Sequence, residues 1–300
     1  MAHLAKVFFA CLFRLIGNKN WGRRNIKYFL SYCRYAMKYI VYWKLLKIPL
    51  HSETILKYKL HFFHYSIFLS LFEDMFLNDE YYVKLPRNPH IIDLGSEVGI
   101  SVSYFKSIYP NARIEAFEPD PVSYKLLTKN IEDNAIKKVT TYNVALANKV
   151  GLMSFYIDPS VEGSLTMSLF EKRQKKRIAV KVDRLSHYIK QRVDLLKMDI
   201  EGAEFDVLSD LSHSKKISLI DSMMMEYHHH IDTKKITYHA FLPFWKRMVL
   251  DISLRQNILS HLRNKHIKIV LSSPTENNTC NPLSFLCIVI VYEKKTYCLV

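Results

Sequence analysis

Two acidic segments of this chain carry residues whose types and spacing could do chemistry. In residues 91–99, Asp93, Gly95 and Gly99 directly follow a short apolar run. Glycines there let the backbone turn sharply and approach a ligand, and the helix expected next supplies free N–H groups. Glu118 stands nineteen residues after Gly99, where a carboxylate can accept hydrogen bonds from ribose hydroxyls. The pattern predicts a cofactor site made of Asp93, Gly95, Ser96, Gly99, Glu118, Pro119 and Asp120.

The loop itself helps to choose the cofactor. A dinucleotide site wants G-x-G-x-x-G, but Glu97 stands where the second glycine would be and adds bulk and negative charge. S-adenosylmethionine carries a sulfonium cation and no phosphate, so it tolerates an acidic loop. The residues therefore favour a methyl donor. The alternatives are a plain strand-to-helix turn, with Asp93 as a helix cap or a loop-bracing carboxylate.

The second acidic segment, residues 193–204, predicts a reaction centre. An extended chain would place Lys197, Asp199 and Glu201 on one side, before a turn at Gly202. Methyl transfer to a hydroxyl needs an aligned nucleophile and a base, and Asp199 or Glu201 could be that base. Lys197 could orient a substrate oxygen or hold a carboxylate. Alternatively Asp199 caps a helix, and Glu201 and Glu204 are its first-turn acids.

Glu226, at the end of the next apolar run, is a further acid for the same cleft. It is followed by three histidines, residues 228–230, which invite a metal interpretation. Adjacent residues of an extended chain point to opposite faces, and no second ligand pair accompanies them. We therefore predict no metal site.

Short apolar runs alternating with helical stretches after Pro89 predict an α/β fold built around a parallel sheet. The last two strands are joined by a loop without a helix and should pair antiparallel at one sheet edge. Further strands are expected at residues 152–157 and 178–182. The predicted sheet strands are residues 91–94, 113–117, 139–144, 195–198, 219–225, 266–271 and 285–292, with helices starting near Ser101, Pro121, Gly202 and Ala240.

The N-terminal region has a different character. Apolar residues recur at helical intervals in residues 21–50 and again in residues 52–78, which predicts two helical regions. The first fifty residues contain ten Lys or Arg and no Asp or Glu, out of a net charge of +15, and aromatics are interleaved with them. Basic plus aromatic composition suggests an anionic partner: a membrane surface, a phosphate-bearing substrate or nucleic acid. The alternative is a helical cap on the catalytic domain.

Composition points to a cytoplasmic protein that could also lie on the inner membrane surface. The apolar stretch at residues 7–16 is interrupted by Arg14, and no run reaches the roughly 18 apolar residues of a spanning helix. The five cysteines form no short-spaced metal set, which suits reduced thiols.

Taken together, these motifs resemble the FkbM-type methyltransferases. The resemblance rests on Asp93-x-Gly95-x-x-x-Gly99-x-Ser101, Glu118-Pro119-Asp120-Pro121, Asn130, Val182-Asp183-x-Leu185, residues 196–204, Glu226-Tyr227-His228, and the lead-in at residues 72–76 and Tyr81. It implies a Rossmann-like class I methyltransferase fold, S-adenosyl-L-methionine as donor, and O-methylation of sugars, glycans or other small metabolites. Lys197, Asp199, Glu201, Glu204 and Glu226 would surround the reaction centre.

The resemblance predicts two domains, and the chain departs from the family's sequence pattern at one place. Residues 1–82 would be a basic, aromatic-rich helical extension, and residues 83–300 the methyltransferase domain. The family usually has Gly-Ala-Asn where this chain has Gly95-Ser96-Glu97.

Three other functions compete with an O-methyltransferase. An RNA methyltransferase is suggested by charge alone, and the chain lacks an N-P-P-Y-like block, so a nucleic-acid partner is disfavoured. A non-catalytic, membrane-associated interaction protein with a degenerate cofactor loop is suggested by Glu97. A dehydrogenase or epimerase is disfavoured by the missing G-x-G-x-x-G. The expected partner is a small-molecule or glycan acceptor, phosphate-bearing or lipid-linked, with membrane contact through residues 1–50.

Overall fold

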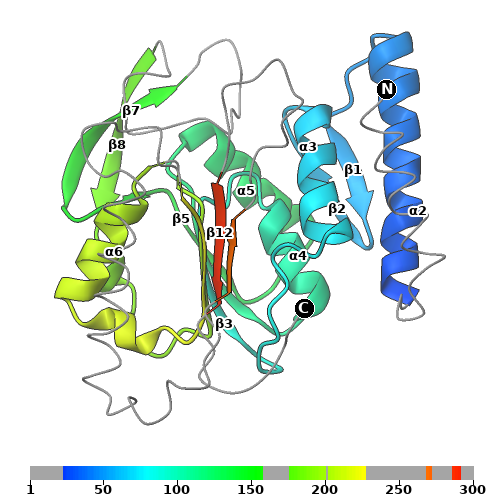
Figure 1. Ribbon diagram of the computed structural model, residues 1–300. Coiled ribbons are helices and arrows are strands. Elements are labelled where there is room, and N and C mark those ends of the chain that lie inside the picture. The colour runs from blue at the N-terminus through cyan, green and yellow to red at the C-terminus, as the bar shows by residue number, and fades with distance from the viewer. Residues whose placement is uncertain (1–22, 158–175, 201, 228–267, 272–285, 292–300) are drawn as a thin grey trace. The chain divides into compact units, whose positions relative to one another are not determined.

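A computed structural model describes residues 23–157, 176–200, 202–227, 268–271 and 286–291 of the chain (Figure 1). The chain divides into two compact units, and each is described by itself. The first contains the described residues up to Lys84, with residues 98–110 and 125–137. The second contains the rest. The domain boundary expected between residues 82 and 83 stays a prediction, as does the helix near Ala240, which lies outside the described residues.

The second unit is built on a seven-stranded sheet of order β11-β12-β10-β9-β3-β4-β5. The five strands from β10 to β5 run parallel, while β12 pairs antiparallel with both β10 and β11. This is the Rossmann-like class I methyltransferase arrangement, so the predicted fold and its antiparallel pairing at the edge are confirmed. The strands are β3 (His90–Leu94), β4 (Arg113–Phe117), β5 (Val139–Tyr142), β9 (Leu195–Met198), β10 (Met223–Tyr227), β11 (Lys268–Leu271) and β12 (Leu286–Val291).

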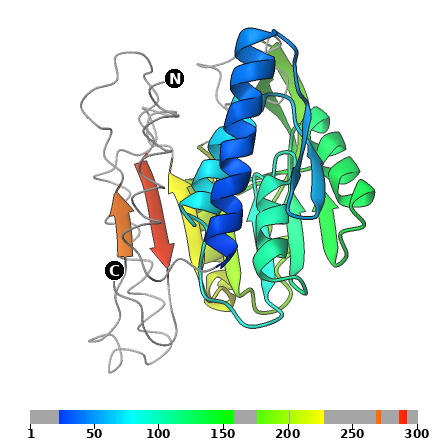
Figure 2. The same ribbon diagram turned by 90° about the vertical axis from the view of Figure 1, so that its right-hand side faces the viewer.

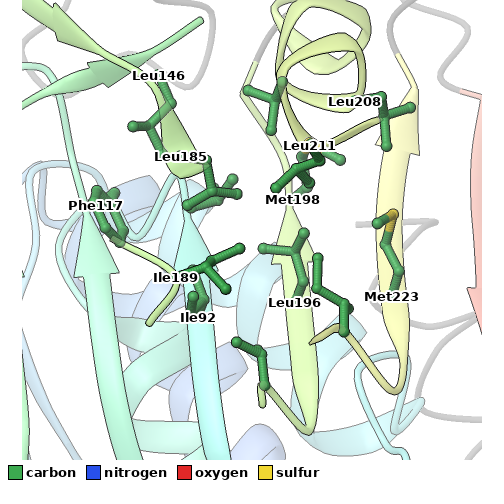
Figure 3. Packing of buried hydrophobic residues seen from close by; sticks show 14 of the residues in the cluster. Ile92, Phe117, Leu146, Leu185, Ile189, Leu196, Met198, Leu208, Leu211 and Met223 are labelled. Carbon is green, nitrogen blue, oxygen red and sulfur yellow. The ribbon is translucent and has the colours of Figure 1, made fainter. Parts of the chain in front are cut away.

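One face of this sheet packs against α6 (Glu204–His213). Leu208 and Leu211 of α6 point toward Leu196, Met198 and Met223 of the strands, and all five are buried (Figure 3). Successive strand residues point to opposite faces of a sheet. Lys197, between Leu196 and Met198 on β9, therefore faces away from α6.

Three further strands form a smaller sheet of order β6-β8-β7. They are β6 (Ala145–Leu146), β7 (Gly151–Ile157) and β8 (Lys176–Asp183), which confirms the strands predicted at residues 152–157 and 178–182. Short 3-10 helices, η4 (Leu185–His187) and η5 (Lys216–Leu219), complete the unit. The strand predicted at residues 219–225 began too early, because residues 216–219 turn as η5 and β10 starts only at Met223.

The first unit is mainly helical but contains a hairpin that the sequence analysis missed. Residues 52–78 were expected to be helical, yet β1 (Ser52–Ile55) and β2 (Tyr58–His61) pair antiparallel. Glu53, Ile55, Tyr58 and Leu60 are buried on one face, which is a period of two, and Leu56 turns the chain at φ 55°. The helices are α2 (Arg23–Lys38), η1 (Tyr39–Leu45, a π-helix), α3 (Tyr65–Phe72), η2 (Glu73–Leu77, a π-helix), α4 (Ile100–Ile108) and most of α5 (Pro121–Asp133).

Aromatic side chains form the core of the first unit. The inward face of α2 carries three buried tyrosines. Tyr28 and Tyr35 pack edge-on against phenylalanines of α3 and η2, and the Tyr32 hydroxyl donates to Glu73 at 3.1 Å. Figure 2 shows α2 alongside the hairpin, where Tyr35 donates to the Thr54 carbonyl at 2.5 Å and Lys38 contacts the buried Glu53 at 2.8 Å. One face of α2 is thus buried within the first unit, while the helical cap on the catalytic domain stays a prediction. Within the described ranges, no helix is long and apolar enough to cross a membrane.

Candidate active site

Acidic residues gather at the carboxyl ends of four neighbouring parallel strands. Asp93 on β3 lies directly opposite Lys197 on β9. Met225 on β10 lies opposite Met198 on β9, so the next residues of these two segments are Glu226 and Asp199. Glu118 follows β4 and continues its ladder by donating its N–H to the Tyr142 carbonyl. In an open α/β sheet, ligands bind at these carboxyl ends.

The loop after β3 is fixed by backbone hydrogen bonds. The N–H groups of Gly95 and Ser96 both donate to the Phe117 carbonyl at 3.0 Å, and the Ser96 hydroxyl donates to the Asp93 carbonyl at 2.9 Å. Gly95 has φ 76°, and a Cβ there would lie 1.8 Å from the Asp199 carbonyl oxygen. The glycine is therefore required by the close approach of two strand ends within the protein, a reason that the sequence analysis did not anticipate.

Gly99 has a similar explanation inside the first unit. It begins α4 with φ 87°, and a Cβ there would lie 2.8 Å from Leu127 Cδ1. The preceding residue is also tied down, since the Asn130 amide donates to the Val98 carbonyl at 2.8 Å. Asn130 belongs to the family motif without an assigned role, and the structure gives it this anchoring role.

Glu118 is a buried carboxyl held by two backbone donors. The Glu97 N–H donates to one oxygen at 2.9 Å and the Asp120 N–H donates to the other at 2.8 Å. Burial raises the pKa of Glu118 to about 8, and the negative charge of Asp120 adds to the rise; the two N–H donors and Lys197 offset only part of it. Burial thus shifts this carboxyl, beside the loop after β3, toward its neutral form.

The residues after Glu118 serve the local structure. Asp120 accepts the Ser123 N–H at 2.7 Å and so caps the start of α5, where Pro121 is the first helical residue. The Asn143 amide donates to the carbonyls of Glu118 at 2.8 Å and Pro119 at 3.0 Å. Sequence analysis missed Asn143 because the strand was predicted over residues 139–144, whereas β5 ends at Tyr142 and leaves Asn143 just beyond it.

Lys197 lies beneath the loop after β3. It is buried, its Nζ donates to the carbonyls of Leu94 at 3.2 Å and Gly95 at 2.9 Å, and it lies 3.3 Å from Asp93 Oδ1. Burial alone would lower the pKa of Lys197, but nearby carboxylates, led by Asp93, outweigh it and raise the pKa. Of the two roles considered for Lys197, this geometry suits holding a carboxylate. It also makes Asp93 a loop-bracing residue.

The remaining predicted reaction-centre residues divide into three groups. Asp199 is half-buried just beyond β9, and it does not cap α6, whose N-cap is Ala203. Glu204 is buried and accepts the Gly202 N–H at 3.0 Å, so it supports the turn into α6. Glu226 is half-buried on β10. Glu201 and the histidines at 228–230 lie outside the described residues. Among the described residues, no three His, Cys, Asp or Glu side chains form a metal-binding group.

Comparison with known proteins identifies the family. Residues 93–256, more than half of the chain, match the methyltransferase FkbM domain. The chain is 33% identical over 172 residues to methyltransferase sdnD of Sordaria araneosa, which covers 46% of this chain and 66% of that protein. It is 26% identical over 198 residues to methyltransferase 1 of Beauveria bassiana, covering 59% of this chain and 76% of the relative.

A more distant relative and one solved structure extend the comparison. The 2-O-methyltransferase NoeI of Sinorhizobium fredii is 26% identical over 143 residues, covering 41% of this chain and 57% of that protein. The crystal structure of a methyltransferase FkbM from Methylobacillus flagellatus superposes with a TM-score of 0.40 and 13% identity, covering 62% of this chain and 48% of the other. Because the FkbM domain matches more than half of this chain's length, the chain belongs to the FkbM methyltransferase family.

Proposed function

We propose that this protein transfers a methyl group from S-adenosylmethionine to a hydroxyl oxygen of a sugar, glycan or other small metabolite. The observation that carries the proposal is the pairing of the loop after β3 with Glu118, whose carboxyl accepts the Glu97 N–H at 2.9 Å. Family membership supports the methyl donor. The acceptor class rests on the family resemblance and on the distant similarity to a 2-O-methyltransferase.

The residues at the strand ends suit this donor. Glu118 offers a buried carboxyl at the end of the second strand of the sheet, where ribose hydroxyls can donate to it. The acids Glu97, Asp199 and Glu226 give the neighbourhood a negative character that suits a sulfonium cation and opposes a pyrophosphate. On this basis Asp93, Lys197, Gly95 and Ser96 shape the loop, and Glu118 binds the donor.

Glu97 departs from the family's loop sequence, but the loop keeps its backbone conformation. Its φ is 46°, the left-handed region that Asn enters more easily than Glu, which explains why the family usually has Asn there. The cost of Glu in this conformation is about 1 kcal/mol. Its N–H still reaches Glu118, so the departure adds strain and charge but keeps the backbone geometry.

In the proposed reaction the acceptor oxygen forms a bond to the methyl carbon. When bound, the donor supplies that carbon on a sulfonium, whose carbon–sulfur bond breaks with its electron pair going to sulfur. The hydroxyl proton needs a base, and we assign it to Asp199, with Glu226 as the neighbouring carboxylate on β10. Lys197 holds the loop in position, and Glu204 fixes the turn that follows Asp199.

The first experiment is calorimetric titration of the full chain with S-adenosylmethionine and with its demethylated product, using NAD as the negative comparison. We expect both sulfur ligands to bind and NAD not to bind. Glu118→Ala removes the ribose acceptor and should weaken donor binding about 10- to 100-fold. Glu132→Ala, an exposed acid on α5, is the control and should leave the affinity unchanged.

The second experiment separates chemistry from donor binding. Asp199→Asn should keep donor affinity within about twofold while slowing methyl transfer to a hydroxyl acceptor about 100-fold or more. Transfer at the wild-type rate would remove Asp199 from the reaction. A folded wild-type chain that binds neither sulfur ligand would favour the non-catalytic interaction protein instead.

A further inference from the structure

The outward face of α2 carries apolar side chains that remain exposed. Leu30 and Met37 are 61% and 64% exposed, and Ile26 on the same stripe is 39% exposed. At 3.6 residues per turn these three lie within an arc of about 40°, on the side opposite the buried tyrosines of the same helix. A surface helix normally presents polar residues on that side. This helix is therefore apolar on both of its faces.

The exposed apolar surface continues past the end of α2. In η1 and the residues after it, Trp43, Leu46 and Ile48 are exposed, and Leu45 is 74% exposed. An indole and branched aliphatic side chains on one short segment are typical of protein segments that lie in a membrane interface. We call the exposed apolar residues of 26–48 the outer stripe.

Positive charge borders the outer stripe. Residues 23–50 contain seven Lys or Arg and no Asp or Glu. Two of these cations turn inward, since Arg24 pairs with Asp79 at 3.0 Å and Lys38 pairs with Glu53 at 2.8 Å. Arg34 donates to the Thr54 carbonyl at 3.1 Å. The exposed Lys27, Lys44 and Lys47 lie near the outer stripe along the chain.

We propose that the outer stripe docks on an anionic lipid membrane, with α2 lying in the plane of the interface. Apolar side chains would enter the acyl boundary while the adjoining lysines contact lipid phosphates. A second copy of this face is a poor occupant, because the exposed lysines beside the stripe would repel those of the other copy. Nucleic acid would meet the lysines but would leave Leu30, Met37 and Leu45 unsatisfied.

The test is co-sedimentation of the full chain with phosphatidylcholine vesicles, with and without one quarter phosphatidylserine. We expect binding only when phosphatidylserine is present. Leu30→Ser, Met37→Ser and Leu45→Ser combined should weaken binding at least about tenfold. The matched control is Leu152→Ser, which is 75% exposed on β7 of the second unit and should change nothing.

Charge is tested separately by Lys27→Gln, Lys44→Gln and Lys47→Gln. Each substitution should weaken binding to phosphatidylserine vesicles roughly fivefold. Lys125→Gln, Lys149→Gln and Lys190→Gln, at exposed lysines elsewhere, should leave binding unchanged. This second set keeps the proposal testable even where the serine variant fails to fold, which circular dichroism would show.

Trp43 reports where the segment goes. In a chain carrying Trp21→Phe and Trp245→Phe, Trp43 is the remaining tryptophan of the three, and its emission should shift to the blue on anionic vesicles. An unshifted emission, or equal binding to vesicles without phosphatidylserine, would overturn the proposal. So would a lipid-free wild-type dimer that the serine variant converts to a monomer, because the stripe would then cover a second copy of the chain.

Discussion

Two neighbouring strand ends bury a carboxyl in opposite ways. At the end of β3, Asp93 lies 3.3 Å from the buried ammonium of Lys197, which also holds two carbonyls of the following loop. At the end of β4, Glu118 has only backbone N–H donors at its two oxygens, and burial raises its pKa to about 8. Asp93 is neutralised within the protein, whereas Glu118 keeps its capacity for an incoming hydroxyl. The first carboxyl therefore suits structure and the second suits binding.

The largest expected effect concerns the carboxyl that is neutralised within the protein, Asp93. Lys197→Met leaves Asp93 buried without its cation, and removing one partner of a buried pair costs about 3–5 kcal/mol. We expect the free energy of unfolding to fall by that amount in denaturant titrations. Adding Asp93→Asn to Lys197→Met should recover part of the loss. A loss below about 1 kcal/mol would mean that Lys197 does not hold Asp93 in solution.

The next effect tests the contact between strand ends. Gly95→Ala places a Cβ 1.8 Å from the Asp199 carbonyl oxygen, so the loop after β3 and the end of β9 must separate. We expect the free energy of unfolding to fall by about 3 kcal/mol and donor binding to be lost. Gly151→Ala is the control, because its φ is also positive but a Cβ there meets nothing within 4 Å. It should cost about 1 kcal/mol, and equal losses in the two variants would contradict the steric argument.

How far the sequence could predict this site follows from the kind of interaction involved. The order of apolar runs was enough to place Asp93, Glu118, Asp199 and Glu226 at strand ends, because parallel strands share one carboxyl edge. It was not enough to assign Lys197 or Asp120, since a residue type does not tell whether its partner is a ligand or a neighbouring backbone group. The Asp93–Lys197 pairing depends on register between β3 and β9, which lie 104 residues apart at these positions.

The hairpin at residues 52–61 shows a second limit. Its apolar residues fit both a helical and an alternating pattern over so short a segment, and its turn lacks the usual Asn-Gly signal. Leu56 occupies a left-handed conformation there instead. Tertiary contacts settle the choice, including the Asn130 and Asn134 amides of the α5 region, which accept the N–H groups of His61 at 2.8 Å and Lys59 at 2.7 Å.

A pH experiment tests the carboxyl that we assign to donor binding, Glu118. Because the folded protein raises the pKa of Glu118 from 4.5 to about 8, it favours the neutral carboxyl. The resulting stability is complete below pH 4.5 and is lost as pH rises through 8. Between pH 6.5 and 7.5, the free energy of unfolding of the wild type should therefore fall by about 1.4 kcal/mol per pH unit relative to that of Glu118→Gln. Parallel curves for the two proteins would show that Glu118 is already ionised.

The smallest effect asks whether the carbonyl support around Glu118 matters for its role. Asn143→Ala removes two hydrogen bonds to the Glu118 and Pro119 carbonyls and should cost about 1 kcal/mol of stability. Donor affinity should fall several-fold, because the segment carrying Glu118 loosens. Asn148→Ala is the matched control, since this exposed side-chain amide donates to the Asp206 carboxylate at 3.1 Å. If Asn143→Ala lowers stability without changing donor affinity, the backbone N–H groups of Glu97 and Asp120 are enough to position the Glu118 carboxyl.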